Sequence, residues 1–322
     1  MRKKVLCMVI IASIAFGGCQ NSSDSFLTYQ DTALKTDYSI DNQLTQGDFF
    51  AKDIAIVSQD DNIGNDTQLT VGASLLINKS DNQVIYADKV YDKLYPASLT
   101  KLLTALVVLR NGELTDMVTI GYNATHITEI GAKTCGFEEG DVISLEALLN
   151  SMLIYSGNDA AIAIAEHVGG SVEDFVKMMN EEALKIGAVH SNFVNPNGLH
   201  DNNQCTTAYD LYLIFNDLLQ YDTFRNIINS DSYKAEYSDK DGNDKQKIFE
   251  TTNLYLENKE DLGTGITVIG GKTGTTSKAG NCLILLSKDD EDNEYISVIL
   301  KAAGRDELYT QMSYLLSKAI SQ

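Results

Sequence analysis

A serine and a lysine three residues apart could supply a nucleophile and the base that activates it. Ser98 and Lys101 open a stretch, 98–110, whose apolar residues recur at helical spacing and which stops at Asn111-Gly112. Residues i and i+3 share one face of a helix, so the lysine amine can reach the serine hydroxyl. A lysine kept partly neutral can accept the hydroxyl proton, and amides at the helix start can stabilise the developing negative charge. The same pattern also fits a serine that only caps the helix.

Two further segments carry polar side chains suited to the same chemistry. Ser156-Gly157-Asn158 stands at the junction of two expected helices, and Lys272-Thr273-Gly274 follows an expected strand, 266–270. A second Ser-x-Asn, Ser80-Asp81-Asn82, lies in an expected hairpin turn and is interpreted as turn chemistry. Three specified residues in a row occur by chance in about one chain in ten of this length, so Lys-Thr-Gly is the most specific of these signals.

The elements that must position these residues form a mixed α/β pattern. Strands are expected at 70–78, 83–87, 266–270, 282–287 and 295–300, the first two forming a hairpin. Helices are expected at 98–110, 144–155, 158–167, 171–186, 207–219 and 306–320. Ser171 and Thr207 are expected to cap two of these helices. Strands from both ends of the sequence should therefore share one antiparallel sheet, and the central helices should form a second lobe.

Taken in this order, the three motifs resemble the active-site set of penicillin-recognising serine enzymes. The resemblance extends to four longer segments: 95–101 (YPASLTK), 151–161 (SMLIYSGNDAA), 195–201 (NPNGLHD) and 271–275 (GKTGT). These look like segments of the D-alanyl-D-alanine carboxypeptidases among the low-molecular-mass penicillin-binding proteins. The resemblance covers the chain from about residue 53 onward. It implies an α/β (α+β) fold of the β-lactamase/transpeptidase type, with an antiparallel sheet flanked by helices plus an all-helical lobe.

The resemblance implies a serine-type D-Ala-D-Ala carboxypeptidase that removes the terminal D-alanine from peptidoglycan stem pentapeptides. Ser98 would attack the carbonyl carbon between the two D-alanines, with Lys101 as general base and Ser156 relaying a proton to the leaving amine. The backbone amides of Ser98 and Thr275 would form the oxyanion hole. β-Lactams would acylate Ser98 in the same geometry, and no cofactor is expected. The residues implied in substrate binding are Asn158, Lys272, Thr273, Gly274 and Thr275.

Arg305, just past the expected strand 295–300, loosely resembles an arginine that orients the substrate carboxylate in this family. The alternative is a surface arginine paired with Asp306 or Glu307. Two other functions stay open: a D,D-endopeptidase that cuts cross-links, and a β-lactam-binding or sensing domain that acylates without turnover. No segment resembles the Glu-x-x-Leu-Asn of serine β-lactamases, so fast β-lactam hydrolysis is not expected.

The N-terminus has the features of an export signal. Arg2, Lys3 and Lys4 precede a twelve-residue apolar stretch, 5–16, which is short for a membrane span. Gly17-Gly18-Cys19 resembles the bacterial lipobox, in which the cysteine after the cleavage point carries diacylglycerol, although Phe16 departs from the usual leucine. An ordinary signal peptide cut nearby is the alternative.

These features predict three regions and a location. The regions are a lipoprotein signal peptide at 1–18, a polar spacer at 19–50 and a penicillin-binding D,D-carboxypeptidase domain at 51–322. Lipidation of Cys19 would anchor an extracytoplasmic protein to the cell membrane.

Composition and charge exclude several other classes. With 322 residues, 43% of them hydrophobic and 22% charged, the chain should fold around a core. Its 25 Lys+Arg against 45 Asp+Glu give a net charge of −20, which disfavours nucleic acid as a partner. The four histidines lack zinc spacing and the acidic run 289–292 is interpreted as a solvated turn, so no metal is expected. Cys135, Cys205 and Cys282 should be buried or half-buried small residues.

Overall fold

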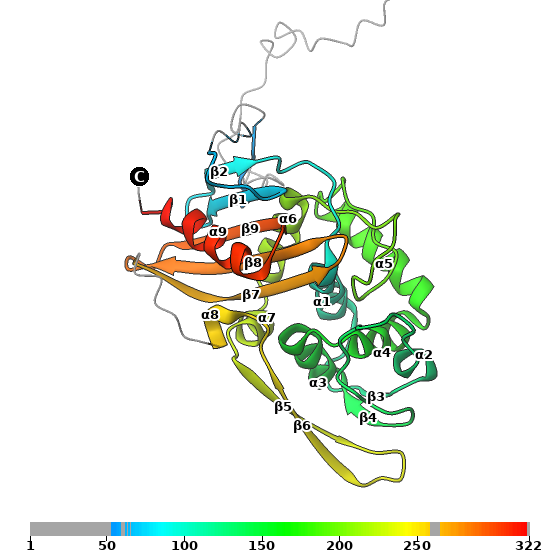
Figure 1. Cartoon of the computed structure of the whole chain (residues 1–322). Helices are drawn as coiled ribbons and strands as arrows, with labels where there is room; N and C mark the ends of the chain where they lie inside the picture. The colour runs from blue at the N-terminus through cyan, green and yellow to red at the C-terminus, as the bar shows by residue number, and fades with distance from the viewer. Residues whose placement is uncertain (1–52, 59–61, 63, 65, 258–264, 321–322) are drawn as a thin grey trace, which may run out of the picture. The chain divides into compact units, whose positions relative to one another are not determined.

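An antiparallel sheet joins the first and the last strands of the described chain. Its order is β2-β1-β9-β8-β7, and each neighbouring pair runs antiparallel (Figure 1). The bounds are β1 Ala73–Asn78, β2 Gln83–Asp88, β7 Ile266–Thr276, β8 Gly280–Asp289 and β9 Glu294–Ala302. The predicted hairpin and the sheet shared by both ends of the sequence are therefore confirmed.

The structure is a computed structural model that describes residues 53–58, 62, 64, 66–257 and 265–320. The signal peptide predicted at 1–18, the spacer predicted at 19–50 and Cys19 lie outside the described residues. In the described part, no helix combines the length and apolar character that crossing a bilayer requires.

Strand β7 continues well past the end predicted at residue 270 and carries the Lys-Thr-Gly segment within it. Gly270 and Gly271 interrupt the β-branched pattern from which the strand was predicted. Both glycines are required by the close approach of neighbouring backbone. A Cβ on Gly270 would lie 2.1 Å from the carbonyl oxygen of Ile228, and one on Gly271 would lie 2.1 Å from that of Ile284. After a register shift between Val268 and Gly270, the strand stays paired with β8 as far as Thr276.

Alternation along the sheet divides the core into two layers. Leu283 and Leu285 of β8 pack toward α9 (Arg305–Ser317), which lies across one face of the sheet in Figure 1. Ile284 and Leu286, the neighbouring positions, belong to the larger core shared with the helical lobe. Successive side chains of a strand point to opposite faces, so one strand serves both layers.

The helices predicted between the two groups of strands are present, together with three short helices that were not predicted. The bounds are α1 Thr100–Asn111, α2 Tyr122–Thr125, α3 Leu145–Asn150, α4 Asn158–Gly169, α5 Val172–Lys185, α6 Ala208–Leu218, α7 Asp222–Ile228 and α8 Leu254–Glu257. The caps Ser171 and Thr207 are confirmed, because their side chains accept the N–H groups of Asp174 and Asp210. Two of the predicted helices are only partly α-helical. The helix predicted at 98–110 begins with the 3-10 turn η2 (Ala97–Leu99), and the one predicted at 144–155 ends as the π-helical segment η3 (Ser151–Tyr155).

A second antiparallel sheet, of order β3-β4-β5-β6, was not predicted. Its bounds are β3 Met117–Thr119, β4 Val142–Ser144, β5 Ser232–Ser238 and β6 Asp244–Glu250. β3 and β4 are too short to show alternation. β5 and β6 are mostly exposed and rich in charged residues, so hydrophobic periodicity does not mark them. The short helices α2, α7 and α8 were missed for the same lack of a long periodic pattern.

The minor predictions for cysteines and for the acidic run are confirmed. Cys135 and Cys282 are buried, Cys205 is partly buried, and all three thiols are free. The acidic residues after β8 form the turn to β9, in which the Asp289 carboxylate accepts the N–H groups of Glu291 and Asn293.

Candidate active site

The serine and lysine of the first motif lie within hydrogen-bond distance. Lys101 Nζ is 3.1 Å from Ser98 Oγ, and both residues lie at the junction of η2 and α1. Ser98 does not cap α1, because Leu99 occupies the cap position. Ala97, just before it, has a φ of +48°, a left-handed conformation that turns the chain sharply into the helix. The N-cap alternative for Ser98 is therefore excluded.

Lys101 is fully buried, with no carboxylate among its hydrogen-bond partners. Its amine also donates to Asn158 Oδ1 at 2.8 Å and to the carbonyl oxygen of Asn197 at 2.5 Å. Burial lowers the pKa of Lys101 to about 7, and the positive charge of Lys133 adds to this effect, while Asp159 opposes it. The amine is therefore partly neutral near physiological pH, which is the state a general base needs.

The second motif is presented by the end of η3. Ser156 has a φ of +72°, a left-handed conformation that is strained for a residue other than glycine. Its hydroxyl accepts a 2.9 Å hydrogen bond from Lys272 Nζ, and Lys272 is fully buried. Burial lowers the pKa of Lys272 well below its usual value, and the nearby amines of Lys101 and Lys133 lower it further. The two motif lysines thus each hold one motif serine.

Strand β7 forms the wall opposite Ser156 and comes very close to Ser98. A Cβ on Gly274 would lie 3.0 Å from the backbone nitrogen of Ser98, so only glycine lets the strand approach this closely. Side chains on the strand are held by hydrogen bonds: Thr273 Oγ1 lies 2.5 Å from Thr252 Oγ1, and Thr275 Oγ1 donates to Asn281 Oδ1 at 3.1 Å.

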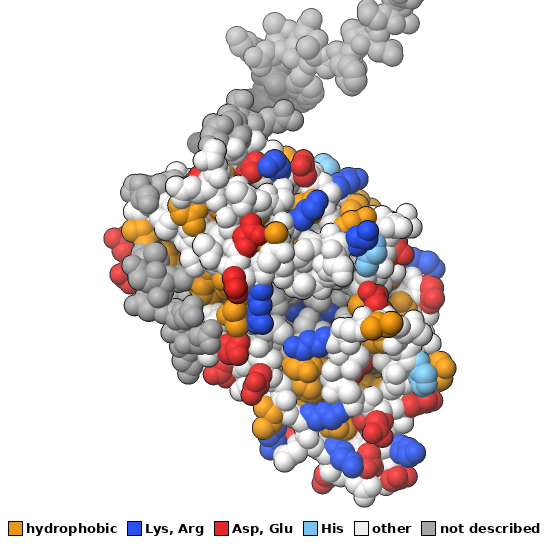
Figure 2. Space-filling view, viewed as in Figure 1, with side chains coloured by type: hydrophobic (Ala, Val, Ile, Leu, Met, Phe, Trp, Pro, Cys, Tyr) orange, Lys and Arg blue, Asp and Glu red, His pale blue; other side chains and the backbone are white. Residues whose placement is uncertain are grey.

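A cleft of about 620 Å³ is lined by residues of all three motifs. Its lining includes Ser98, Ser156, Thr273, Gly274, Thr275 and Arg305, all predicted site residues. The other predicted residues, Lys101, Asn158 and Lys272, are buried behind this surface and reach it through hydrogen bonds. Figure 2 shows Lys and Arg side chains gathered around a hollow in the viewed face.

Arg305 lies in the cleft lining and is exposed there. Among the described residues it forms no ion pair with Asp306 or Glu307. Glu307 instead accepts hydrogen bonds from Thr70 Oγ1 and from the N–H of Ala303. The surface ion pair considered from the sequence is therefore not formed.

Several residues of the cleft could not be predicted from a sequence motif. Lys133 comes from the loop 131–140, and Thr252 and Tyr309 come from segments without a recognised motif. Asn197 contributes a backbone carbonyl, which a side-chain pattern does not reveal. Within the described ranges, no cluster of three His, Cys, Asp or Glu has the arrangement of a metal site.

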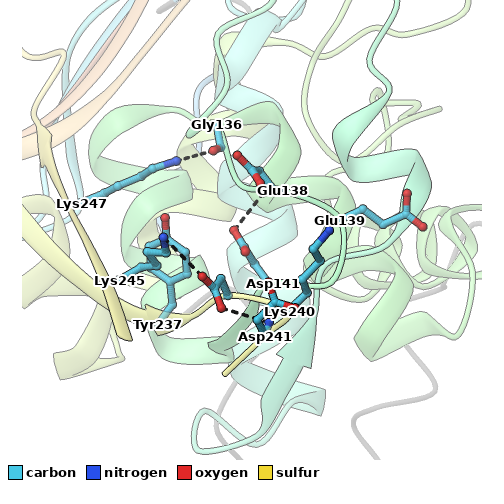
Figure 3. Close-up of a pocket in the computed structure, with 10 residues that line it drawn as sticks. Gly136, Glu138, Glu139, Asp141, Tyr237, Lys240, Asp241, Lys245 and Lys247 are labelled. Atoms are coloured by element: carbon cyan, nitrogen blue, oxygen red, sulfur yellow. Dashed lines mark hydrogen bonds and ion pairs between the residues drawn. The ribbon is translucent and has the colours of Figure 1, made fainter. Parts of the chain in front are cut away.

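The loop 131–140 is held to the second motif by its backbone. The N–H of Asn158 donates to the carbonyl oxygen of Lys133 at 2.9 Å. The Asp159 carboxylate, which is buried, accepts the N–H groups of Cys135 at 2.8 Å and of Gly136 at 2.9 Å. From the opposite side Lys247 of β6 donates to the carbonyl oxygen of Gly136, as Figure 3 shows. The position of Lys133 is thereby fixed relative to Ser156 and Asn158.

The arrangement of the sheet, the helical lobe and the cleft is shared with a protein of known structure. The structure is similar to the crystal structure of the Streptomyces K15 DD-transpeptidase, with a TM-score of 0.73 and 23% identity, over 79% of this chain and 98% of that chain. This similarity confirms the predicted fold, an antiparallel sheet flanked by helices plus a helical lobe.

The family described as D-alanyl-D-alanine carboxypeptidase matches residues 57–304, and the chain belongs to that family. It is 29% identical to the D-alanyl-D-alanine carboxypeptidase DacF of Bacillus subtilis over 257 residues, 78% of this chain and 62% of DacF. It is 32% identical to DacA of Haemophilus influenzae over 240 residues, 72% of this chain and 57% of DacA. The chain thus spans about three fifths of the length of these curated relatives.

Proposed function

We propose that this protein is a serine-type D-Ala-D-Ala carboxypeptidase that removes the terminal D-alanine from peptidoglycan stem pentapeptides. The observation that carries the proposal is the 3.1 Å contact between Ser98 Oγ and Lys101 Nζ, with the lysine pKa lowered to about 7. Family membership supports the same reaction, since the relatives carry this activity in their names.

Acylation begins when Lys101 accepts the hydroxyl proton of Ser98. Ser98 Oγ then attacks the carbonyl carbon between the two D-alanines, and the N–H groups of Ser98 and Thr275 stabilise the oxyanion. The C–N bond breaks as Ser156 relays the proton from Lys101 to the leaving amine of D-alanine, which returns Lys101 to its neutral form. The hydrogen bond from Lys272 orients the Ser156 hydroxyl for this transfer. An ester on Ser98 and free D-alanine result.

Deacylation returns the enzyme to its starting state. A water molecule gives a proton to the base and attacks the ester carbonyl, which releases the shortened peptide acid and restores the Ser98 hydroxyl. We assign recognition of the free carboxylate of the terminal D-alanine to Arg305 and Thr275, which line the cleft and can supply a positive charge and a hydroxyl. A β-lactam carbonyl acylates Ser98 by the same attack.

Replacing the nucleophile tests the proposal. Ser98→Ala should abolish covalent labelling by a fluorescent penicillin and D-alanine release from a pentapeptide, because Ser98 is the one hydroxyl bonded to Lys101 among the described residues. An unchanged thermal unfolding transition serves as the control for folding. Labelling that persists in the alanine variant would refute the assignment.

An assay with two substrates distinguishes the carboxypeptidase from the endopeptidase and from the β-lactam-binding or sensing domain. Purified protein is incubated with a stem pentapeptide and with a cross-linked muropeptide, and the products are followed over time. D-alanine release from the pentapeptide supports the carboxypeptidase. Cleavage of the cross-link alone would indicate an endopeptidase, and stoichiometric penicillin labelling with neither reaction would indicate a binding or sensing domain.

We also propose that the domain acts outside the cytoplasm, where peptidoglycan lies, tethered to the membrane by a lipid on Cys19. The support is the sequence alone: a basic start, an apolar stretch at 5–16 and Gly17-Gly18-Cys19. A diacylglycerol supplies two acyl chains, which gives stable anchoring where one chain would not.

A further inference from the structure

The cleft carries more positive charge than the proposed reaction uses. Lys133 and Arg305 both line it and are exposed there, while Lys101 and Lys272 lie buried behind it. Within the described part of the chain, none of these four groups forms a salt bridge. Such a cluster is unexpected in a chain of net charge −20 and indicates that anionic groups bind in the cleft.

Lys133 is fixed beside the reacting groups. Its carbonyl oxygen accepts the N–H of Asn158, and its Nζ lies 3.8 Å from the centre of the Tyr155 ring, the residue before Ser156. The Lys133 amine therefore lies on the Tyr155 ring, next to the segment that carries Ser156. Partial burial lowers the pKa of Lys133, and repulsion by the positive charge of Arg305 lowers it further.

The substrate's terminal carboxylate accounts for only one of the two exposed cations. Arg305, with Thr275 on the β7 side of the cleft, is suitably placed for that group. The one acidic residue lining the cleft among the described residues, Glu257, forms no ion pair with Lys133. Both D-alanine side chains are methyl groups. The nearest further side chain of the peptide is that of the residue preceding the two alanines, and we assign the second anion to it.

We propose that Lys133 forms a second carboxylate subsite, which selects stem peptides whose third residue bears a side-chain carboxylate over peptides whose third residue bears only an amine. The proposal rests on the proposed function and names the substrate class for it. An amine at that position would add a further cation to the cluster, whereas a carboxylate forms a charge-assisted hydrogen bond with the Lys133 ammonium.

Two pentapeptides that differ by a single carboxylate provide the test. One carries diaminopimelate as its third residue and the other carries lysine, which is the same side chain without the carboxylate. The expected kcat/KM for D-alanine release is about tenfold or more higher for the diaminopimelate peptide. Lys133→Met should lower that ratio to near one, and Lys133→Glu should invert it.

Two further variants serve as references. Arg305→Ala should slow both peptides by the same factor, because both end in the same carboxylate. Lys177→Met makes the same charge change on the exposed face of α5, where the lysine pairs with Asp174, and should leave the ratio unchanged. The ratio is independent of the fraction of active enzyme and of any change in the Lys101 pKa, so a partly misfolded variant still reports it.

The outcomes separate this inference from the proposed function. Release of D-alanine from neither peptide, with intact penicillin labelling, would overturn the proposed function. Release from both at equal kcat/KM in the wild-type protein, or a preference that Lys133→Met leaves unchanged, would overturn the subsite while the carboxypeptidase stands.

Discussion

At the scale of single residues, Lys101 shows how burial can bring the pKa of a lysine into the range that a general base needs. Its three hydrogen-bond acceptors are a hydroxyl, an amide oxygen and a backbone carbonyl, all neutral. A neutral partner stabilises an ammonium far less than a carboxylate does, so desolvation dominates and the pKa falls to about 7. The Asp159 charge raises this pKa without overcoming the effect of burial, and the hydrogen bonds of its carboxylate go to backbone N–H groups.

The rate of acylation should therefore follow the protonation of Lys101. Below pH 7 the amine is increasingly protonated and cannot accept the Ser98 proton, so the labelling rate by fluorescent penicillin should fall about a hundredfold from pH 8 to pH 5. Lys133→Met removes a positive charge near Lys101, which raises the Lys101 pKa and should move this acidic limb to higher pH. Stopped-flow labelling across the pH range measures both effects.

Lys177→Met is the control for the pH profile, because this exposed lysine lies outside the cleft and its removal should not move the midpoint. A labelling rate that stays flat between pH 5 and pH 8 would contradict Lys101 as the base. A midpoint that moves to lower pH in Lys133→Met would contradict the electrostatic coupling of the two lysines.

At the scale of elements, the loop 131–140 is positioned by a carboxylate buried beneath it. Asp159 is 2% exposed and accepts the N–H groups of Cys135, Gly136 and, at 3.4 Å, Phe137. The helix α4 that carries Asp159 also carries Asn158, whose N–H holds Lys133. The first turn of α4 therefore has two roles: Asn158 accepts a hydrogen bond from Lys101, and Asp159 holds the loop 131–140.

Asp159→Ala should loosen this loop and destabilise the fold. Hydrogen bonds to a charged acceptor are lost and backbone N–H groups remain buried without partners, so unfolding in urea should become easier by about 2–4 kcal/mol. Penicillin labelling should also slow, because Asn158 and Lys133 lose their support. Asp174→Ala is the matched control, since that carboxylate is exposed and its removal should change stability much less. Equal stability of the Asp159 variant and the wild-type protein would contradict the role assigned to this carboxylate.

A comparison of the observed elements with the predicted ones shows which features of the fold can be predicted from the sequence. Periodicity located the β1–β2 hairpin and the helices α4, α5 and α6, because their buried faces repeat over several turns or pairs. It did not reveal the left-handed conformation of Ser156, the carbonyl of Asn197 or the amine of Lys133 in the cleft. These depend on backbone geometry and on contacts between distant segments, which no local pattern records.

At the scale of the whole molecule, the distribution of charge matters more than its total. A net charge of −20 repels anions at a distance, whereas the exposed amine of Lys133 and guanidinium of Arg305 attract them at the cleft. Salt screens both effects over a Debye length of about 8–10 Å at physiological ionic strength. On the proposed function, the local field of the cleft would attract an anionic substrate, and the acidic remainder of the surface would repel other polyanions.

The proposed membrane anchor, a lipid on Cys19, can be tested by replacing this cysteine. Cys19→Ala should release the protein from the membrane fraction or leave it unprocessed at its larger size, because the acceptor of the diacylglycerol is gone. Cys7→Ala is the matched control: this cysteine lies inside the predicted signal peptide, and its removal should leave processing and anchoring unchanged. Fractionation followed by immunoblotting and by penicillin labelling measures location and folding together. A Cys19 variant that stays with the membrane at the size of the processed wild-type protein would contradict the lipid anchor, and mass spectrometry of the mature N-terminus would then show where an ordinary signal peptide is cut.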